Sequence, residues 1–527
     1  MTPTRGAVAA GHQGTADAAT WILSAGGNAI DAAVGAALAA SVCEPLLTGP
    51  GGGGLMTIRD GSTGRVVVLD FFSSFPGLDD GLLPREFLAL AVNYGPTTQH
   101  FHAGRGAVAV PGVLPGLHAA WKRFGALDRP SVAAPAVRLA REGWVASDAS
   151  EVVFRMLRPI TSIGADSREA WSPEGRHLAP GDLVRSPAMA DALELFGDEG
   201  CDPFVTGHHA QALLKACGPP HGSLGPDDLA HYRVVEREPL VGEFGGTTLY
   251  VPPPPCAGGA LVLFGLELLD RLPDPRSPVA EARLLSAVMA ETECVRREGW
   301  DTGMFMPGAA EGLLDTANLA RHARRVIDRL DSGGPPPVAY DGGPRPPGNT
   351  THLSVVDEHG NACAYTSSNG ETCGYLWPGT GFPVNNFLGE ADIHPNGFHQ
   401  GPPGARFRTM MTPAIRECAG TVEALGTGGA NRIRTAMLQV MHRLGRGETV
   451  EGAVLAPRMH LEDGRLDVED MGQGDDWIAA AEQGASVTTR FEGRHLYFGG
   501  VHTAVRHADG RLDGVGDPRR SGVGSTV

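Results

Sequence analysis

The hydrophobic pattern in the first half of the chain predicts helices interrupted by short strands. Apolar positions between residues 15 and 42 recur at helical spacing, and the Gly-Gly-Asn break at 26–28 divides them into two helices. The second of these is rich in alanine, which favours tight helix packing. Two strands are expected at 55–59 and 65–71, around an Asp-Gly turn. Further helices are predicted at 117–124, 132–143, 260–272 and 280–297.

The second half opens on a strand pattern. Residues 350–356 alternate between apolar and polar, residues 357–361 form a turn sequence, and residues 362–366 return, which predicts a β-hairpin. A Gly/Pro-rich stretch at 331–348 precedes this hairpin and is expected to be a linker. Strands and helices mix on both sides of it, so an α+β or layered α/β fold is favoured over an all-β fold.

Composition and charge exclude several classes of function. The 527 residues carry a net charge of −17, which argues against a nucleic-acid partner. The eight cysteines include no CxxC pair and no zinc-like spacing, so we expect reduced thiols, no metal and no cofactor. The apolar run at 32–42 is too short to cross a bilayer, and no leader pattern stands out. These features lead us to expect a cytoplasmic protein without a membrane partner.

The junction between the linker and the hairpin suggests a chemical role. Gly348-Asn349 leads directly into a strand that opens with Thr350. Cleavage between Asn349 and Thr350 would give Thr350 a free α-amine beside its own hydroxyl, and such an amine can act as the base for that nucleophile. On these residues alone, a surface loop followed by an ordinary edge strand remains the alternative.

Several motifs, in order along the chain, carry a resemblance to the γ-glutamyltranspeptidase family. They lie between about residue 10 and residue 520, nearly the whole chain. The matching segments are Gly-Gly-Asn-Ala-Ile-Asp-Ala-Ala at 26–33, Glu-Pro at 44–45 with the glycines that follow, Val-Pro-Gly at 110–112, Thr-Thr-His-Leu-Ser-Val-Val-Asp at 350–357, the segment 378–386, Gly-Gly at 428–429, Ala-Pro-Arg at 456–458 and Gly-Asp-Pro-Arg at 516–519.

The resemblance implies an N-terminal-nucleophile hydrolase with an α+β fold, a four-layer αββα sandwich. It further implies a precursor that cleaves itself into segments 1–349 and 350–527, which form a heterodimer interlaced in one fold. Thr350 matches the family's nucleophile, and Ser368 matches a hydroxyl that bonds the nucleophile's amine. Gly429 and Ala430 match the glycine pair whose backbone N–H groups form the oxyanion hole, a role that a methyl group does not prevent.

The substrate pocket departs from the family pattern on the side that binds a carboxylate. Phe72 stands where the family has an arginine that clamps the α-carboxylate of the γ-glutamyl group. An aromatic ring cannot replace a bidentate arginine–carboxylate pair. Thr409 and Met410 match two consecutive serines, so one hydroxyl is lost as well. These changes make ordinary glutathione chemistry doubtful.

The side that binds the substrate amine is also altered. Phe387 stands in place of a family glutamine, the family's acid persists as Glu390, and Asn369 is expected to supply an amide. Two other interpretations stay open: Phe72 and Phe387 as core aromatics, and Glu390 as a solvated loop acid.

Three further features are assigned structural roles. His352 is expected to be a packed strand residue, and Asp31 a buried structural partner. The glycine run at 49–54 is not followed by Lys-Ser/Thr, so it is expected to allow close backbone packing instead of phosphate binding.

The leading hypothesis is an autoprocessing enzyme that uses Thr350 on a small-molecule substrate. The altered pocket favours a specialised relative, of the kind that the family contributes to lincomycin and pyrrolobenzodiazepine pathways, where a carbon–carbon bond beside a keto-acid group is cleaved to form alkylproline units. An ordinary γ-glutamyl transferase or glutathione hydrolase is the alternative within the family. An unprocessed, non-catalytic scaffold or binding protein is the alternative of another class.

Overall fold

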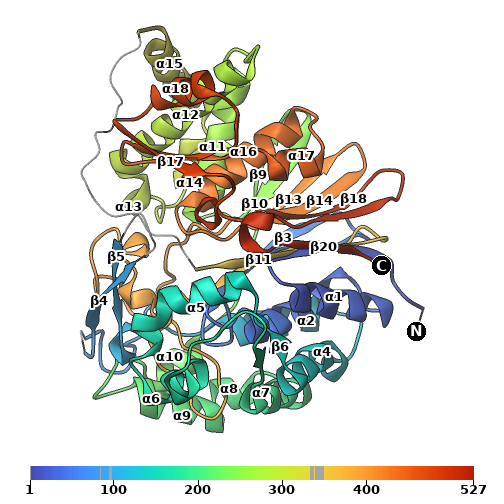
Figure 1. Cartoon of the computed structure of the whole chain (residues 1–527), viewed down its shortest axis with the longest axis vertical. Helices are drawn as coiled ribbons and strands as arrows, with labels where there is room; N and C mark the ends of the chain where they lie inside the picture. Colours follow the sequence, from blue (N-terminus) through green and yellow to red (C-terminus); the bar gives the residue numbers. More distant parts are fainter. Residues whose placement is uncertain (1, 84, 94–97, 333–337, 339–348) are drawn as a thin grey trace.

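The computed structural model describes residues 2–83, 85–93, 98–332, 338 and 349–527. Two antiparallel sheets stack face to face between two layers of helices (Figure 1). The first sheet has the order β20 (Val523–Thr526), β1 (Gly6–Ala10), β11 (Thr351–Asp357), β12 (Ala362–Ser368), β2 (Gly53–Arg59), β3 (Val66–Phe71) and β8 (Val235–Arg237). The second has the order β19 (Leu512–Val515), β18 (His502–Arg506), β14 (Thr421–Gly426), β13 (Ala414–Cys418), β10 (Thr247–Val251) and β9 (Leu240–Phe244).

Small apolar side chains fill the space between the two sheets. Ala7, Val356 and Ala364 of the first sheet pack with Ala424 and Ala504 of the second in one buried cluster. Short side chains allow the sheets to approach closely, which strengthens the dispersion contacts between them. The expected four-layer αββα sandwich is therefore confirmed.

Helices rich in small residues cover the outer face of the first sheet. The helices α1 (Gln13–Ser24) and α2 (Ala29–Cys43) pack directly on it, and every residue of α2 is buried. Gly35 shows how closely the two helices approach, because a Cβ atom there would lie 2.0 Å from Cδ1 of Ile22. Both helices fall where the apolar spacing predicts them. The same layer continues with α3 (Val113–Phe124), α4 (Arg129–Glu142), α5 (Asp148–Thr161), α6 (Ala165–Trp171), α7 (Pro187–Glu199), α8 (Asp202–Val205), α9 (His208–Cys217) and α10 (Pro226–His231).

A second helical layer covers the other sheet. Its main members are α11 (Ala257–Arg271), α12 (Pro278–Val295) and α16 (Arg432–Gly445), whose buried side chains share one core with that sheet. None of the described helices is long and apolar enough to cross a membrane. The remaining elements of this side are α13 (Asp301–Gly303), α14 (Ala309–Leu313), α15 (Thr316–Ser332), α17 (Val450–Leu455), α18 (Asp475–Glu482), β15 (Met459–Glu462), β16 (Arg465–Asp470) and β17 (Val487–Glu492). Two small hairpins also form: β4 (Leu88–Asn93) pairs with β5 (Thr98–Ala103), and β6 (Trp144–Val145) pairs with β7 (Leu183–Val184).

The expected hairpin forms, and the expected linker needs one correction. The strands β11 and β12 pair antiparallel around the predicted turn. Helix α15 continues to Ser332, so residues 331 and 332 end a helix and do not begin a linker. The rest of the predicted linker, apart from Val338, lies outside the described residues.

Asp31 ties the start of α2 to a neighbouring loop. Its carboxylate accepts hydrogen bonds from the backbone N–H groups of Asn28 (3.1 Å), Ala126 (2.9 Å) and Leu127 (3.2 Å). The side chain is fully buried. The expected structural role of Asp31 is confirmed.

Replacing Asp31 with alanine is expected to lower the free energy of unfolding by about 3 kcal/mol, because one buried and two partly buried N–H groups lose their acceptor. The Asp31→Asn variant keeps one carbonyl acceptor in place and should lose about 1 kcal/mol. Urea unfolding followed by circular dichroism measures both values. Equal losses in the two variants would contradict this account of the hydrogen bonds.

Candidate active site

The β11–β12 hairpin brings Thr350 next to Ser368. The register pairs Thr351 with Ser367, so the residue before β11 lies opposite the last residue of β12. The Ser368 hydroxyl donates a 2.6 Å hydrogen bond to the carbonyl oxygen of Asn349 and accepts one of 2.8 Å from the N–H of Gly370. The hydroxyl therefore contacts the peptide bond at which cleavage is expected.

Two more contacts fix the chain directly after that bond. The guanidinium of Arg520 donates to the carbonyl oxygen of Thr350 at 3.1 Å. The Thr351 hydroxyl donates to Glu44 at 2.6 Å, and the same carboxylate accepts from Thr15 at 2.8 Å. Sequence reasoning did not assign Glu44 or Arg520 a role, although both lie in or beside segments that carry the family resemblance.

The turn at 428–430 packs directly on Thr350. A Cβ atom on Gly428 would lie 1.9 Å from the carbonyl oxygen of Thr350, so only glycine fits there. Gly429 has φ of 130° and Ala430 has φ of 46°, both in the region that favours glycine. Among the described residues, neither backbone N–H has a hydrogen-bond partner. Two unpaired donors beside Thr350 are what an oxyanion hole requires.

The glycine run at 49–54 packs against the same hairpin. Cβ atoms would lie 2.2 Å from the carbonyl oxygen of Pro383 at Gly51, 2.1 Å from that of Ser368 at Gly52, and 2.6 Å from the backbone nitrogen of Ser73 at Gly53. The expected close backbone packing is confirmed, and it supports the end of β12 from behind.

A small pocket of about 40 Å³ lies in front of Thr350, and we call it the catalytic pocket. Phe72 and Phe387 form part of its wall, with ring centroids 4.8 Å apart. Both rings are buried, so the two interpretations as pocket wall and as core aromatics hold together. Its described lining is Phe72, Asn349, Thr350, Ser368, Phe387, Glu390, Asp392, Ile393, Arg408, Thr409, Met410, Met411, Ala430, Asn431 and Ile433.

Comparison with known proteins agrees with this arrangement. The family model for gamma-glutamyltranspeptidase matches residues 15–527. The chain belongs to the γ-glutamyltranspeptidase family. It is 32% identical to the acylase ACY 1 proenzyme of Pseudomonas sp. (strain SE83), over 88% of this chain and 84% of that protein. It is 26% identical to the glutathione hydrolase proenzyme of Bacillus subtilis (strain 168), over 98% of this chain and 91% of that protein.

The solved structures show the same fold. The crystal structure of cephalosporin acylase from Bacillus halodurans superposes with a TM-score of 0.82 at 22% identity, over all of this chain and 96% of that one. The four-layer arrangement is therefore that of γ-glutamyltranspeptidase-type hydrolases, and the chain is an enzyme of this family of hydrolases and transferases.

Within this family framework, Asn369 does not take the place expected for a substrate-binding amide. Its Nδ2 donates to the carbonyl oxygen of Pro45 at 3.2 Å, and it is absent from the described lining of the catalytic pocket. Asn431, beside Ala430, lines the pocket instead. The side chain of Asn369 instead lies against the glycine run at 49–54, behind β12. The sequence pattern did not predict this orientation.

Arg408 also lines the pocket and was not predicted. Its guanidinium forms a 2.8 Å ion pair with Asp301 and donates to the carbonyl oxygen of Asp392 at 3.0 Å. The charge is thus already compensated inside the protein. Arg408 does not restore the carboxylate clamp that is missing at Phe72.

Three acids lie together at this pocket: Glu390 and Asp392 are half-buried and belong to its lining, and the buried Glu371 lies near Glu390. Burial, with a contribution from Asp392, raises the pKa of Glu390 to about 8. Burial also raises the pKa of Asp392, and burial with the nearby Glu390 raises that of Glu371 well above its usual range. One oxygen of Glu390 and one of Glu371 have no hydrogen-bond partner among the described residues. Glu390 is therefore a pocket acid that is largely protonated at neutral pH, and not a solvated loop acid.

His352 is packed as expected. Its ring nitrogens lie 2.8 Å from the hydroxyls of Thr366 and Ser354, and the side chain is buried. Burial lowers its pKa well below the usual value, so the ring is neutral. These bonds are those of a structural residue.

The raised pKa of Glu390 has a consequence for stability. A carboxyl whose pKa is higher in the folded state contributes stability that is complete below pH 4.5 and is lost as pH rises through about 8. As pH rises from 5 to 8, the wild type should therefore lose free energy of unfolding, as measured in urea, because Glu390 ionises in the folded state. The Glu390→Gln variant lacks this carboxyl, so its loss over the same range should be smaller by roughly 2 kcal/mol. The exposed Glu451→Gln is the control and should follow the wild type. Parallel pH profiles for Glu390→Gln and the wild type would contradict the raised pKa of Glu390.

Proposed function

We propose that the chain is a precursor that cleaves itself between Asn349 and Thr350. The observation that supports this most directly is the hydrogen bond that the Ser368 hydroxyl donates to the carbonyl oxygen of Asn349. This bond polarises the carbonyl toward attack by the Thr350 hydroxyl. The C–N bond then breaks to give an ester, and water hydrolyses the ester to an Asn349 carboxylate and a free Thr350 amine.

In the mature enzyme, Thr350 would act as nucleophile and its own α-amine as base. The Thr350 oxygen attacks the substrate carbonyl, and the negative charge that develops on the carbonyl oxygen is stabilised by the N–H groups of Gly429 and Ala430. The leaving group takes a proton from the α-amine, and water releases the acyl group. Segments 1–349 and 350–527 would stay together, because β11 and β12 are paired inside a sheet built from both.

The substrate would not be an ordinary γ-glutamyl compound. The Phe72–Phe387 pair stands where the family clamp for a carboxylate is expected, and the one arginine in the described pocket lining is paired with Asp301. A desolvated carboxylate placed there would have no free cation to pair with, which is costly. We favour an intermediate of a natural-product pathway, of the antibiotic alkylproline type, in which a carbon–carbon bond beside a keto-acid group is cleaved.

Other activities have specific support. The likeness to the glutathione hydrolase proenzyme of Bacillus subtilis favours an ordinary γ-glutamyl transferase or glutathione hydrolase as the second candidate. The likeness to the Pseudomonas acylase supports amide hydrolysis as a third candidate. A non-catalytic scaffold would have no need for unpaired N–H groups beside Thr350.

Self-cleavage is tested with Thr350→Ala, which should remain a single 55.0 kDa chain on a denaturing gel. The wild type should separate into two fragments. Thr350→Ser should still cleave, because serine keeps the nucleophilic oxygen, but more slowly than the wild type. The matched control is Thr351→Ser, which keeps its hydroxyl toward Glu44 and should cleave like the wild type. A wild-type chain that stays intact after long incubation would refute the proposed cleavage.

The pocket assignment is tested with γ-glutamyl-p-nitroanilide. We expect kcat/KM at least about 100-fold below that of a conventional glutathione hydrolase measured in parallel, because a charge-assisted clamp is missing. Phe72→Arg should raise kcat/KM about tenfold, and Phe72→Leu should not. Self-cleavage of each variant on a gel verifies that it folds. Wild-type turnover at the conventional rate would rule out the altered pocket.

A further inference from the structure

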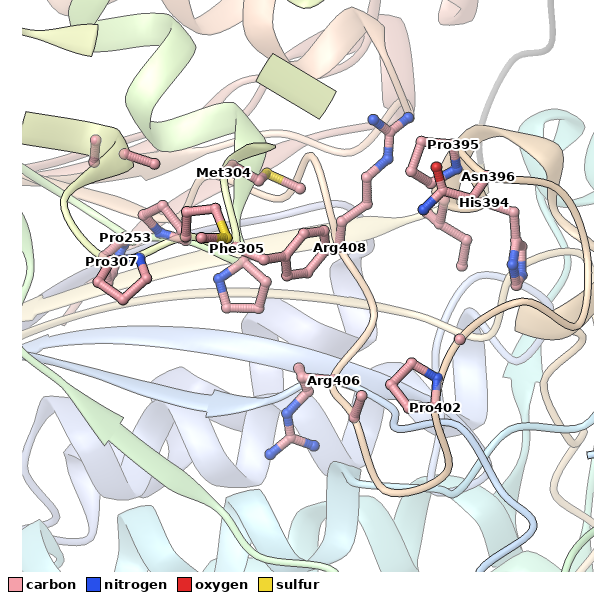
Figure 2. A pocket seen from close by; sticks show the side chains of 18 of the residues that line it. Pro253, Met304, Phe305, Pro307, His394, Pro395, Asn396, Pro402, Arg406 and Arg408 are labelled. Carbon is pink, nitrogen blue, oxygen red and sulfur yellow. The ribbon is translucent and has the colours of Figure 1, made fainter. Parts of the chain in front are cut away.

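A second, larger cavity of about 710 Å³ lies beside the catalytic pocket (Figure 2). Ile393 and Arg408 belong to the described lining of both. The catalytic pocket has room for one small group, whereas cavities of roughly 300–1,000 Å³ hold whole small molecules. A substrate of ordinary size therefore needs space beyond the catalytic pocket, and this cavity adjoins it.

The two spaces share a wall built from two chain segments. On the segment after β3, Phe72 lines the catalytic pocket and Phe75 lines the second cavity. On the other segment, Thr409 lines the catalytic pocket and Arg406 the second cavity. Phe75 stacks on Phe407 with ring centroids 3.8 Å apart, which joins the segments. Arg408 stands where the two spaces meet.

The lining of the second cavity is mostly apolar. Figure 2 shows Pro253, Met304, Phe305 and Pro307 on one side, with Arg408 between them and the 394–396 loop in this view. Phe305 is 51% exposed and the neighbouring Met306 is 67% exposed, so apolar surface faces open space. Covering such surface with an apolar ligand is favourable, and methionine adapts readily to different shapes.

The three arginines of the described lining are paired within the protein, and the lining also contains the acid Glu311. Arg237 and Arg406 both form ion pairs with Asp70, at 2.7 Å and 3.3 Å. Arg408 is paired with Asp301 at 2.8 Å. Arg237 and Arg406 share one carboxylate, but Glu311 adds a negative charge to the same lining, so little net positive charge is left to attract a phosphate or a free carboxylate. The chemistry of the cavity fits a neutral alkyl or aryl group.

We propose that the second cavity binds the apolar end of the substrate, an alkyl or aryl group, while its reacting carbonyl lies at Thr350. The identity of the reacting carbonyl rests on the proposed function; the binding of an apolar group does not. The substrate class is then an acyl compound with a hydrophobic extension that passes Ile393 and Arg408.

Kinetics with two anilides test this substrate class. The butyryl group of butyryl-p-nitroanilide is short enough to remain in the catalytic pocket, whereas the 6-phenylhexanoyl group of 6-phenylhexanoyl-p-nitroanilide also reaches the cavity. For the phenyl substrate, Phe305→Ala and Met306→Ala should raise KM about five- to tenfold with kcat unchanged, and Ala309→Trp, which fills the cavity, should raise it further. Butyryl turnover should be unaffected. The exposed residues Val145 and Leu183 lie outside the described cavity lining, and their alanine variants are the controls. Equal effects on both substrates, or no effect on either, would overturn the proposal.

A binding measurement separates this proposal from the proposed function. The compound 6-phenylhexan-1-ol has no carbonyl, so its binding to the full chain can be followed by calorimetry whether or not the chain cleaves itself. We expect binding to the wild type and to Thr350→Ala, a five- to tenfold weaker affinity in Phe305→Ala, and none in Ala309→Trp. Absence of binding to the wild type, or undiminished binding to Ala309→Trp, would overturn the cavity assignment. Failure of self-cleavage or anilide turnover with this binding intact would refute only the proposed function.

Discussion

Three consecutive residues at the start of β11 are each held by a contact from a different part of the chain. Ser368 of β12 binds the carbonyl of Asn349, Arg520 binds that of Thr350, and Glu44 binds the hydroxyl of Thr351. Because β11 lies between β1 and β12 within the first sheet, its register cannot slip without breaking both ladders. The rest of the site is built around this fixed point, since the 428–430 turn and the glycine run pack against the same hairpin.

The pocket in front of Thr350 combines an apolar wall with acids whose pKa values are raised. Burial suppresses ionisation of Glu390, and the aromatic pair beside it lowers the local polarity further. A protonated carboxyl can donate a hydrogen bond to a substrate oxygen, or give up its proton when a cationic group enters. The pocket thus favours neutral or amine-bearing groups over carboxylates, the opposite of the preference that an arginine clamp would confer.

The sequence allowed prediction of those parts of the site that depend on local pattern. Period-two alternation and a turn sequence suffice to place the β11–β12 hairpin, and with it Thr350 beside Ser368. Ala430 is at a position where the backbone adopts φ of 46°, so the family's preference for glycine there has a conformational cause. The unpredicted parts depend on long-range side-chain placement. Asn369 turns toward Pro45, and Arg408 finds its partner in Asp301, more than a hundred residues away. No local spacing encodes either contact.

Arg520 also bears on how the proposed base could work. Burial and the nearby Arg432 lower the pKa of Arg520 to about 10, so it remains charged at neutral pH. Its guanidinium lies 3.1 Å from the carbonyl oxygen of Thr350, next to the position where cleavage would create an α-amine. A neighbouring positive charge and a buried setting both disfavour a second positive charge. Arg520 would therefore favour the neutral form of that amine, which is the form that can accept the proton of the Thr350 hydroxyl. Glu44 lies on the other side, but its carboxylate is engaged by two threonine hydroxyls. The contact that fixes the backbone of Thr350 would thus also prepare its proposed amine to act as a base.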